Sequence, residues 1–452
     1  MPRRSADGRL VYALIAFHYP PSTQVAAVRA WGLARELAEA GDEVHVFTPV
    51  ADGPTRPGVT VHVVAGSQTG DGVKTALGLP PGASLRHGVP RALAPIASAA
   101  VRLGKEIALF PDGARSWADA CARALESWLE ASPCDVLIST ASPVSAHLAA
   151  MRLRSRHPEL VWISDWRDLW TANPFYNSGR IRRSRDLRLE RLLVANADGH
   201  VATTRQMAAI LQEQYPGANV RAIYNGFDEA SYRSNSPKQA GTAPLTLTHA
   251  GALYEGNCST LPLLRAVADL MAEGLVARDR LRLEFAGPPD AVLQEGVSLL
   301  GLDDVVHLHG VLPRTKAHEL MRDSDVLFVI SASRIGSTSV VPAKTFEYIE
   351  ARRPVLALNC GHSSELGMLL EKTRTGTCAR SDHEVREAVL RLYHEFEESG
   401  RIAFDPDVRE LAQFTHAHMA RSFDDFAREL RDARPDHEPD ATGGRASRRR
   451  PS

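Results

Sequence analysis

The chain has 452 residues, which is enough for two domains with separate hydrophobic cores. Its 44% hydrophobic and 24% charged residues are typical of a globular protein in water, and exclude a fibrous or wholly disordered chain. The formal net charge of -1 argues against a basic surface made for nucleic acid or for an anionic membrane, so we expect no nucleic-acid partner.

The first apolar run, "RLVYALIAF" at residues 9–17, predicts a buried strand. Two arginines precede it, but the small-residue cleavage site of a signal peptide is missing. No stretch of the sequence approaches the roughly 18 apolar residues of a membrane span. The five cysteines are widely spaced without a CxxC pair, which predicts reduced cysteines in a cytoplasmic protein and no zinc site.

Strand-like runs and helical patterns then alternate along the whole chain. "VRAWGLARELAEAG" predicts a helix that ends at Gly41, and "DEVHVFTP", "DVLIST" and "LVWISDW" predict further strands. A second alternating series begins at "LTLTHAGAL". This alternation predicts an α/β protein of two doubly wound, Rossmann-like domains that face each other across a cleft, where ligands bind at the carboxyl ends of the strands.

Changes in composition set the predicted boundaries. An N-terminal domain covers residues 1–232, a polar linker rich in Pro, Gly and Ser covers 233–244, and a C-terminal domain covers 245–412. A helix at 413–433 is expected to pack back on the N-terminal domain. Residues 434–452 lack large apolar side chains and are expected to be disordered.

Several common catalytic motifs are missing from the sequence. The loop after the first strand is "HYPPSTQVAA", without the G-x-G-x-x-G that lets a backbone approach a dinucleotide pyrophosphate. We also find no Walker lysine motif, no H-E-x-x-H and no G-x-S-x-G. Dehydrogenase, nucleotide triphosphatase, metalloprotease and α/β-hydrolase chemistry are therefore disfavoured.

Seven blocks, taken in order, resemble a bacterial branch of the family-4 retaining glycosyltransferases, which have the GT-B fold. They include "FHYPPSTQVAAVRAWGLARELAEAGDEVHVFTP", "DVLISTASPVSAHLAA", "WISDWRDLWTANPFY", "THAGALYEG" and "VPAKTFEYIEARRPVLAL". The likeness spans roughly residues 10–433 and is weakest between 66 and 109. It implies a nucleoside-diphosphate sugar in the C-terminal domain, a hydroxyl acceptor on the N-terminal domain, transfer with retention at the anomeric carbon, and no metal cofactor.

The resemblance assigns the main donor residues to the helix that follows Pro342. Glu347 is expected to accept hydrogen bonds from the ribose hydroxyls, and Lys344 at the helix start is expected to stabilise the diphosphate. An i,i+3 surface ion pair between these two residues is the structural alternative. Further donor contacts are expected from Gly251, Tyr254, Gly310, Val311 and Arg334.

The chain departs from the family pattern at two places. Ser339 stands where many members have a second glutamate near the sugar. The stretch "GALYEGNCST" also lacks the basic residues that grip the diphosphate in many members. We therefore expect Lys344, Arg334 and backbone N–H groups to neutralise the phosphates.

On the acceptor side, "SDWRDLW" places Asp165, Arg167 and Asp168 directly after a strand. Asp168 is a candidate to orient or deprotonate an acceptor hydroxyl, and its alternative role is to cap the next element or pair with Arg167. Asp165, Arg167 and His18 are candidate acceptor contacts.

Two questions stay open at this level. The segment at residues 85–110 mixes basic and apolar residues, and is either a lid helix packed on its own domain or a weak peripheral membrane contact at the inner face of the cell membrane. The alternatives to transfer are a nucleotide-sugar epimerase of the same two-domain fold and a non-catalytic sugar-nucleotide-binding subunit. Acidic and basic residues paired for epimerisation are not evident.

Overall fold

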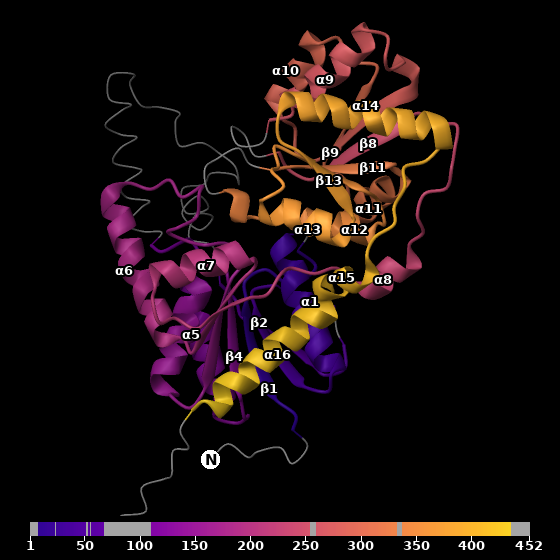
Figure 1. Cartoon of the computed structure of the whole chain (residues 1–452). Coiled ribbons are helices and arrows are strands. Elements are labelled where there is room, and N and C mark those ends of the chain that lie inside the picture. The colour runs from indigo at the N-terminus through magenta and orange to yellow at the C-terminus, as the bar shows by residue number, and fades with distance from the viewer. Residues whose placement is uncertain are drawn as a thin grey trace, which may run out of the picture.

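The computed structural model describes residues 8–22, 24–50, 53–54, 56–66, 110–253, 259–331 and 337–434. They form two α/β domains, each built on a parallel sheet (Figure 1). Tyr254 and Arg334, most of the segment at 85–110, and the tail after residue 434 lie outside the described residues. The predictions made for them stay predictions.

The N-terminal sheet has the strand order β3-β2-β1-β4-β5-β6-β7 within the described residues. Its central strands are buried along their whole length because helices cover both faces, which explains their apolar sequences. The strands are β1 Val11–Ala16, β2 Glu43–Thr48, β3 Val59–Val63, β4 Val136–Ala141, β5 Val161–Trp166, β6 Gly199–Ala202 and β7 Val220–Ala222. The helices are α1 Val25–Glu39, α4 Arg115–Leu129, α5 Ser145–Arg156, α6 Arg180–Asn196, α7 Arg205–Gln214 and α8 Glu229–Ser234.

The C-terminal sheet has the order β10-β9-β8-β11-β12-β13 within the described residues. Its strands are β8 Leu245–Ala250, β9 Leu281–Ala286, β10 Val306–Gly310, β11 Val326–Ile330, β12 Val355–Leu358 and β13 Gly376–Ala379. Its helices are α9 Leu261–Ala272, α10 Ala291–Leu299, α11 Arg314–Asp323, α12 Lys344–Glu350, α13 Glu365–Thr373, α14 Asp382–Ser399 and α15 Val408–Leu411. In both sheets the strand order reverses beside the first strand, between β1 and β4 and between β8 and β11. Such switch points place a crevice at the carboxyl ends of the strands.

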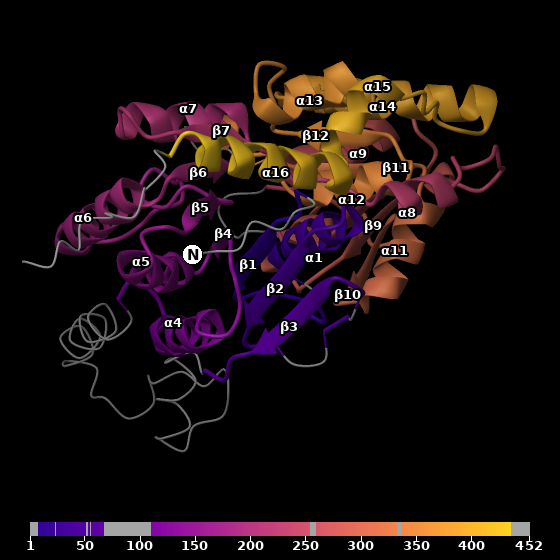
Figure 2. The ribbon, with the colours of Figure 1, turned by 90° about the horizontal axis from the view of Figure 1, so that it is seen from below.

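The last described helix, α16 (His416–Asp432), returns to the N-terminal domain and packs along α1 (Figure 2). Met419, Phe423 and Phe426 on one face of α16 are buried in the core that contains β1. Gly32 of α1 allows this close contact, since a Cβ there would lie 2.7 Å from the His416 ring.

The chain crosses between the domains twice, and the two crossing segments touch each other. The Phe227 N–H donates to the Phe414 carbonyl at 2.9 Å, and the His416 N–H donates to the Phe227 carbonyl at 3.0 Å. This short parallel bridge connects the end of the N-terminal domain to the start of α16. It fixes where the two crossings lie relative to each other.

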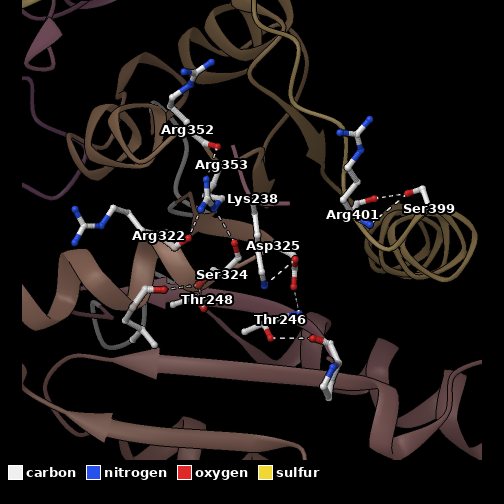
Figure 3. Close-up of polar contacts among 12 residues, drawn as sticks. Lys238, Thr246, Thr248, Arg322, Ser324, Asp325, Arg352, Arg353, Ser399 and Arg401 are labelled. Atoms are coloured by element: carbon white, nitrogen blue, oxygen red, sulfur yellow. Dashed lines mark hydrogen bonds and ion pairs between the residues drawn. The ribbon is translucent and has the colours of Figure 1, made fainter. Parts of the chain in front are cut away.

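The first crossing segment, which includes the predicted linker at residues 233–244, is held on the C-terminal domain (Figure 3). The Arg353 guanidinium donates to the Ser236 carbonyl at 2.9 Å and to the Ser324 carbonyl at 2.8 Å. The Lys238 ammonium lies 2.9 Å from the buried Asp325 carboxylate, which also accepts the Thr246 N–H. Despite its Pro, Gly and Ser content, this segment is ordered by cationic side chains.

Within the described residues, no helix is both long and apolar enough to cross a membrane.

The packing of α16 yields a first prediction. Phe423 is 0% exposed, so Phe423→Ala leaves a cavity and should lower the free energy of unfolding of the N-terminal domain by about 3–5 kcal/mol. All six tryptophans lie in residues 31–170, so tryptophan fluorescence during denaturant unfolding reports on this domain. Val408→Ala removes a side chain that is 67% exposed and should change the value by less than about 0.5 kcal/mol. Equal losses would contradict the proposed packing.

Candidate active site

A cavity of about 480 Å³ lies between the two domains. The N-terminal domain lines it with side chains that follow β5, β6 and β7, and the C-terminal domain lines it with residues from β8, β11 and the start of α12. Polar side chains from both domains meet there: Arg167, Asp168, Asn173, Thr203 and Asn225 from the first, and His249, Ser331 and Lys344 from the second. The cavity therefore lies at the carboxyl ends of strands from both sheets, where doubly wound folds bind ligands.

Lys344 is the first residue of α12 and lines this cavity. Its ammonium nitrogen lies 3.0 Å from His249 Nε2 and 3.5 Å from the Ala252 carbonyl oxygen. His249 Nδ1 lies 3.0 Å from the Phe328 carbonyl. Because a carbonyl can only accept, Nδ1 carries the proton and Nε2 accepts from the ammonium.

The imidazole of His249 is held neutral. Burial, with the nearby Lys344 charge, lowers the pKa of His249 to about 3. A neutral imidazole accepts a hydrogen bond from the ammonium and adds no negative charge beside it. His249 was not among the residues expected from the sequence, although the block "THAGALYEG" contains it.

Gly251 makes room for the lysine. It has φ of +129°, and a Cβ on it would lie 2.8 Å from Lys344 Nζ and 3.2 Å from Cε. Gly287, directly after β9, also has no room for a side chain, because a Cβ on it would lie 2.4 Å from the Gly251 carbonyl oxygen. The space expected to serve donor phosphates at Gly251 is thus occupied by the Lys344 ammonium.

A second cavity of about 200 Å³ continues from the first, since His249 and Leu253 line both. It lies at the carboxyl ends of β8, β9 and β10, with Gly310 on its wall. Gly310 has φ of +67°, and its carbonyl accepts the Gly287 N–H at 2.8 Å. Val311, the next residue, is 73% exposed and does not line this cavity.

Glu347 lies one turn after Lys344 on α12 but lines a different hollow, of about 90 Å³, together with His318 and Glu350. The half-buried carboxylate lies 3.5 Å from the Arg314 guanidinium at the start of α11. Loss of water raises the pKa of Glu347, which the Arg314 and Lys344 charges partly oppose. Lys344 and Glu347 therefore face different cavities, and an ion pair between them is not the observed arrangement.

Asp168 and Arg167 line the main cavity from the N-terminal side. Arg167 donates to the Ala141 and Ser142 carbonyls at 2.5 and 2.7 Å, which fixes the loop after β4. The exposed Asp168 side chain opens to the cavity. The protein around it and the Asp165 carboxylate raise its pKa, and the Arg167 charge partly opposes this. His18 is half-buried near Arg167; burial and that charge lower its pKa to about 4, so it is neutral at pH 7.

Asp165 has a different environment from its neighbours in the sequence. It is paired with Arg29 of α1 through two hydrogen bonds of 2.8 and 3.0 Å, and both side chains are at most 3% exposed. Arg29 also donates to the Ile223 and Tyr224 carbonyls. We therefore assign Asp165 to this buried ion pair, and the acceptor contact expected for it is not retained.

Polar contacts between the domains lie beside the cavity. The Thr204 hydroxyl donates to the carbonyl of the buried Ser339 at 2.7 Å. The Glu365 carboxylate, at the start of α13, accepts the Gln206 N–H and the Tyr224 hydroxyl, both at 2.6 Å. Ser339, which stands at the position of the family's second glutamate, thus contacts the N-terminal domain through its backbone carbonyl.

Among the described residues, no group of three or more His, Cys, Asp or Glu side chains is arranged to hold a metal ion. The described cationic side chains that line the cavity are Lys344 of the C-terminal domain and Arg167 of the N-terminal domain, and the carboxylate of Asp168 lines it as well. This arrangement can bind an anionic ligand on one wall and orient a hydroxyl group on the other.

Comparison with known families agrees with this architecture. Residues 26–231 match the model of Glycosyltransferase Family 4, and residues 244–395 match the model of Glycosyl transferases group 1. The chain is a family-4 glycosyltransferase. The fold class expected from the sequence is confirmed as GT-B, and a search of curated protein sequences finds no significant match.

Solved structures resemble the glycosyltransferase over nearly its whole length. Sucrose-phosphate synthase from Thermosynechococcus elongatus has 16% identity and a TM-score of 0.61, with coverage of 94% of this chain and 100% of that one. A glycosyltransferase from Rickettsia africae has 11% identity and a TM-score of 0.56, with coverage of 94% and 100%. WaaG, a glycosyltransferase involved in lipopolysaccharide biosynthesis, has 14% identity and a TM-score of 0.52, with coverage of 93% and 98%. At such identities these likenesses define the fold.

The contact between Gly251 and Lys344 gives a second prediction. Gly251→Ala should displace the ammonium and reduce turnover by roughly 100-fold, because a shift of about 1 Å in an active-site group has effects of that size. Gly301→Ala is the matched control, since Gly301 also has positive φ (+61°) but open space around its Cβ position. Initial rates of both purified variants measure the effect. If both lost the same activity, backbone strain and not the lysine would be responsible.

Glu350, at the end of α12, gives a third prediction. Burial, with the Asp228 and Glu347 carboxylates nearby, raises its pKa to about 7 against an ordinary value of 4.5. The folded state thus binds the Glu350 proton more tightly than the unfolded state does. The contribution of this proton to the stability of the fold is fully present below pH 4.5 and is lost as pH rises through 7. Glu350→Gln should therefore gain stability relative to wild type between those values in denaturant unfolding. Glu398→Gln, on the exposed face of α14, is the control, and a pH-independent difference for Glu350→Gln would contradict the assignment.

Proposed function

We propose that this glycosyltransferase moves a sugar from a nucleoside-diphosphate sugar to a hydroxyl acceptor, with retention at the anomeric carbon. The observation that carries the proposal is the Lys344 ammonium, oriented by neutral His249 over Gly251 inside the cavity between the domains. A lysine there serves a ligand whose negative charge increases during the reaction, as a leaving diphosphate does.

The donor extends along the C-terminal domain in this proposal. The diphosphate contacts Lys344, and the nucleoside continues toward the second cavity beside Gly310 and Val311. Glu347 of α12 and Arg314 at the start of α11 are paired with each other and line neither of these two cavities. For Glu347 to accept hydrogen bonds from the ribose hydroxyls, its ion pair with Arg314 has to break, or the carboxylate has to bind Arg314 and the ligand together.

The acceptor hydroxyl approaches from the N-terminal wall, where Asp168 orients it and Arg167 and His18 lie nearby. A bond forms between the acceptor oxygen and the anomeric carbon on the face from which the diphosphate departs. The leaving diphosphate oxygen accepts the hydroxyl proton, so no protein nucleophile is required. Lys344 then stabilises the charge on the diphosphate.

The same assay separates transfer from the two alternatives. Sugar transfer releases a nucleoside diphosphate, and a binding subunit releases none. An epimerase converts the sugar nucleotide into an isomer without net release. A panel of nucleoside diphosphates, scored by the rise in melting temperature, first identifies the base, because a ligand bound to the native state stabilises it.

Lys344→Ala is the decisive variant and the fourth prediction. With the donor so identified, its kcat for nucleoside-diphosphate release should fall by roughly 10²–10³-fold, since the charge on the leaving group loses its partner. Lys372→Ala, which removes a half-exposed lysine paired with Glu410, should leave kcat unchanged. An unaltered kcat for Lys344→Ala would contradict the assigned role.

A further inference from the structure

Two cysteines of the C-terminal domain lie in direct contact. Cys360 follows β12 and Cys378 lies within β13, the neighbouring parallel strand. Their sulfur atoms are 2.9 Å apart. The backbone holds them in place, because the Cys360 N–H donates to the Ala379 carbonyl at 3.3 Å.

The pair differs chemically from the other described cysteines. The Cys378 thiol donates to the Cys360 sulfur, and this hydrogen bond lowers the pKa of Cys360. Cys121 and Cys134 are buried in the N-terminal domain, and burial raises the pKa of both thiols. Cys360 is buried, but Cys378 is partly exposed, so a small oxidant can reach the pair.

We propose that Cys360 and Cys378 form a redox-sensitive thiol pair that hydrogen peroxide converts to an intramolecular disulfide. The thiolate of the pair attacks the peroxide and becomes a sulfenic acid, and one water is released. The second thiol displaces the hydroxyl group of the sulfenic acid, which forms the S–S bond and releases a second water. Two thiols and one peroxide thus give one disulfide and two waters, and a dithiol reductant reverses the change.

The position of Cys360 connects this pair to the contact between the domains. The Ser364 hydroxyl lies 3.2 Å from the Cys360 sulfur and accepts the Gly367 N–H, which caps α13. The next residue, Glu365, accepts the Gln206 N–H and the Tyr224 hydroxyl of the N-terminal domain. Four residues therefore separate the sulfur from a carboxylate that joins the two domains.

Disulfide formation requires movement along this path. The sulfur atoms, 2.9 Å apart, must approach to about 2.05 Å, so they move by about 0.9 Å relative to each other. The loop between Cys360 and α13 has little room for this movement, because the Gly361 carbonyl oxygen packs against Gly367. A Cβ on Gly367 would lie only 2.4 Å from that oxygen. Oxidation is therefore expected to shift the start of α13 and to weaken the Glu365 contact.

The modification itself is tested on the full-length chain treated with hydrogen peroxide, as the fifth prediction. Of five thiols in the reduced protein, three should remain in the denatured product. Tryptic mapping without reductant should link the peptides at residues 353–372 and 375–380, and dithiothreitol should separate them. Cys378→Ser should form no such link, whereas Cys121→Ala should form it as wild type does. Five remaining thiols, or a link between other cysteines, would overturn the proposal.

The coupling to the domain contact has a readout that needs no substrate and is independent of the proposed function. Because Glu365 accepts the Gln206 N–H, hydrogen exchange at that amide reports on the contact. Exchange should become several-fold faster after peroxide treatment of wild type and stay unchanged in Cys378→Ser. Phenylarsine oxide, which binds paired thiols, should protect wild type from oxidation and have no effect on Cys378→Ser. Linked peptides with unchanged exchange would overturn the coupling.

Discussion

The site depends on one interaction, the hydrogen bond between the Lys344 ammonium and a histidine that burial keeps uncharged. A lysine side chain is flexible, and a carboxylate would fix it only by cancelling its charge. His249 fixes it through a lone pair, and the Phe328 carbonyl fixes His249 in turn. The rest of the local backbone follows from this, since Gly251 has to be without a side chain where the ammonium passes.

The two domains form one site because few but specific contacts set their arrangement. The crossing segments pair at Phe227 and Phe414, α16 is anchored in the N-terminal core, and Glu365 joins the start of α13 to α7. The polar contacts among these consist of two hydrogen bonds each. Small displacements of α13 can therefore alter how the two walls of the cavity face each other without unfolding either domain.

The N-terminal wall shows why neighbouring residues in a motif can have unrelated roles. Asp165 and Asp168 lie three residues apart, the first within and the second just after the same strand-like run. Asp165 is the fifth residue of β5, and its side chain meets Arg29 of helix α1, 136 positions away in the sequence. Asp168 lies beyond the strand and opens to the cavity. The position at which the strand ends decided between a structural ion pair and a site carboxylate.

The sequence by itself determined the parallel α/β architecture, because strands buried on both faces must be continuous apolar runs and helices between them must be amphipathic. It also predicted Lys344 as a donor residue, and the structure places that side chain on the wall of the cavity. Only the tertiary structure decided that His249 accepts a hydrogen bond from this lysine and that Asp165 forms an ion pair with Arg29. It also decided that Glu347 pairs with Arg314, away from the main cavity. These pairings join residues distant in sequence, and a side chain's pKa and direction depend on neighbours that only folding brings together.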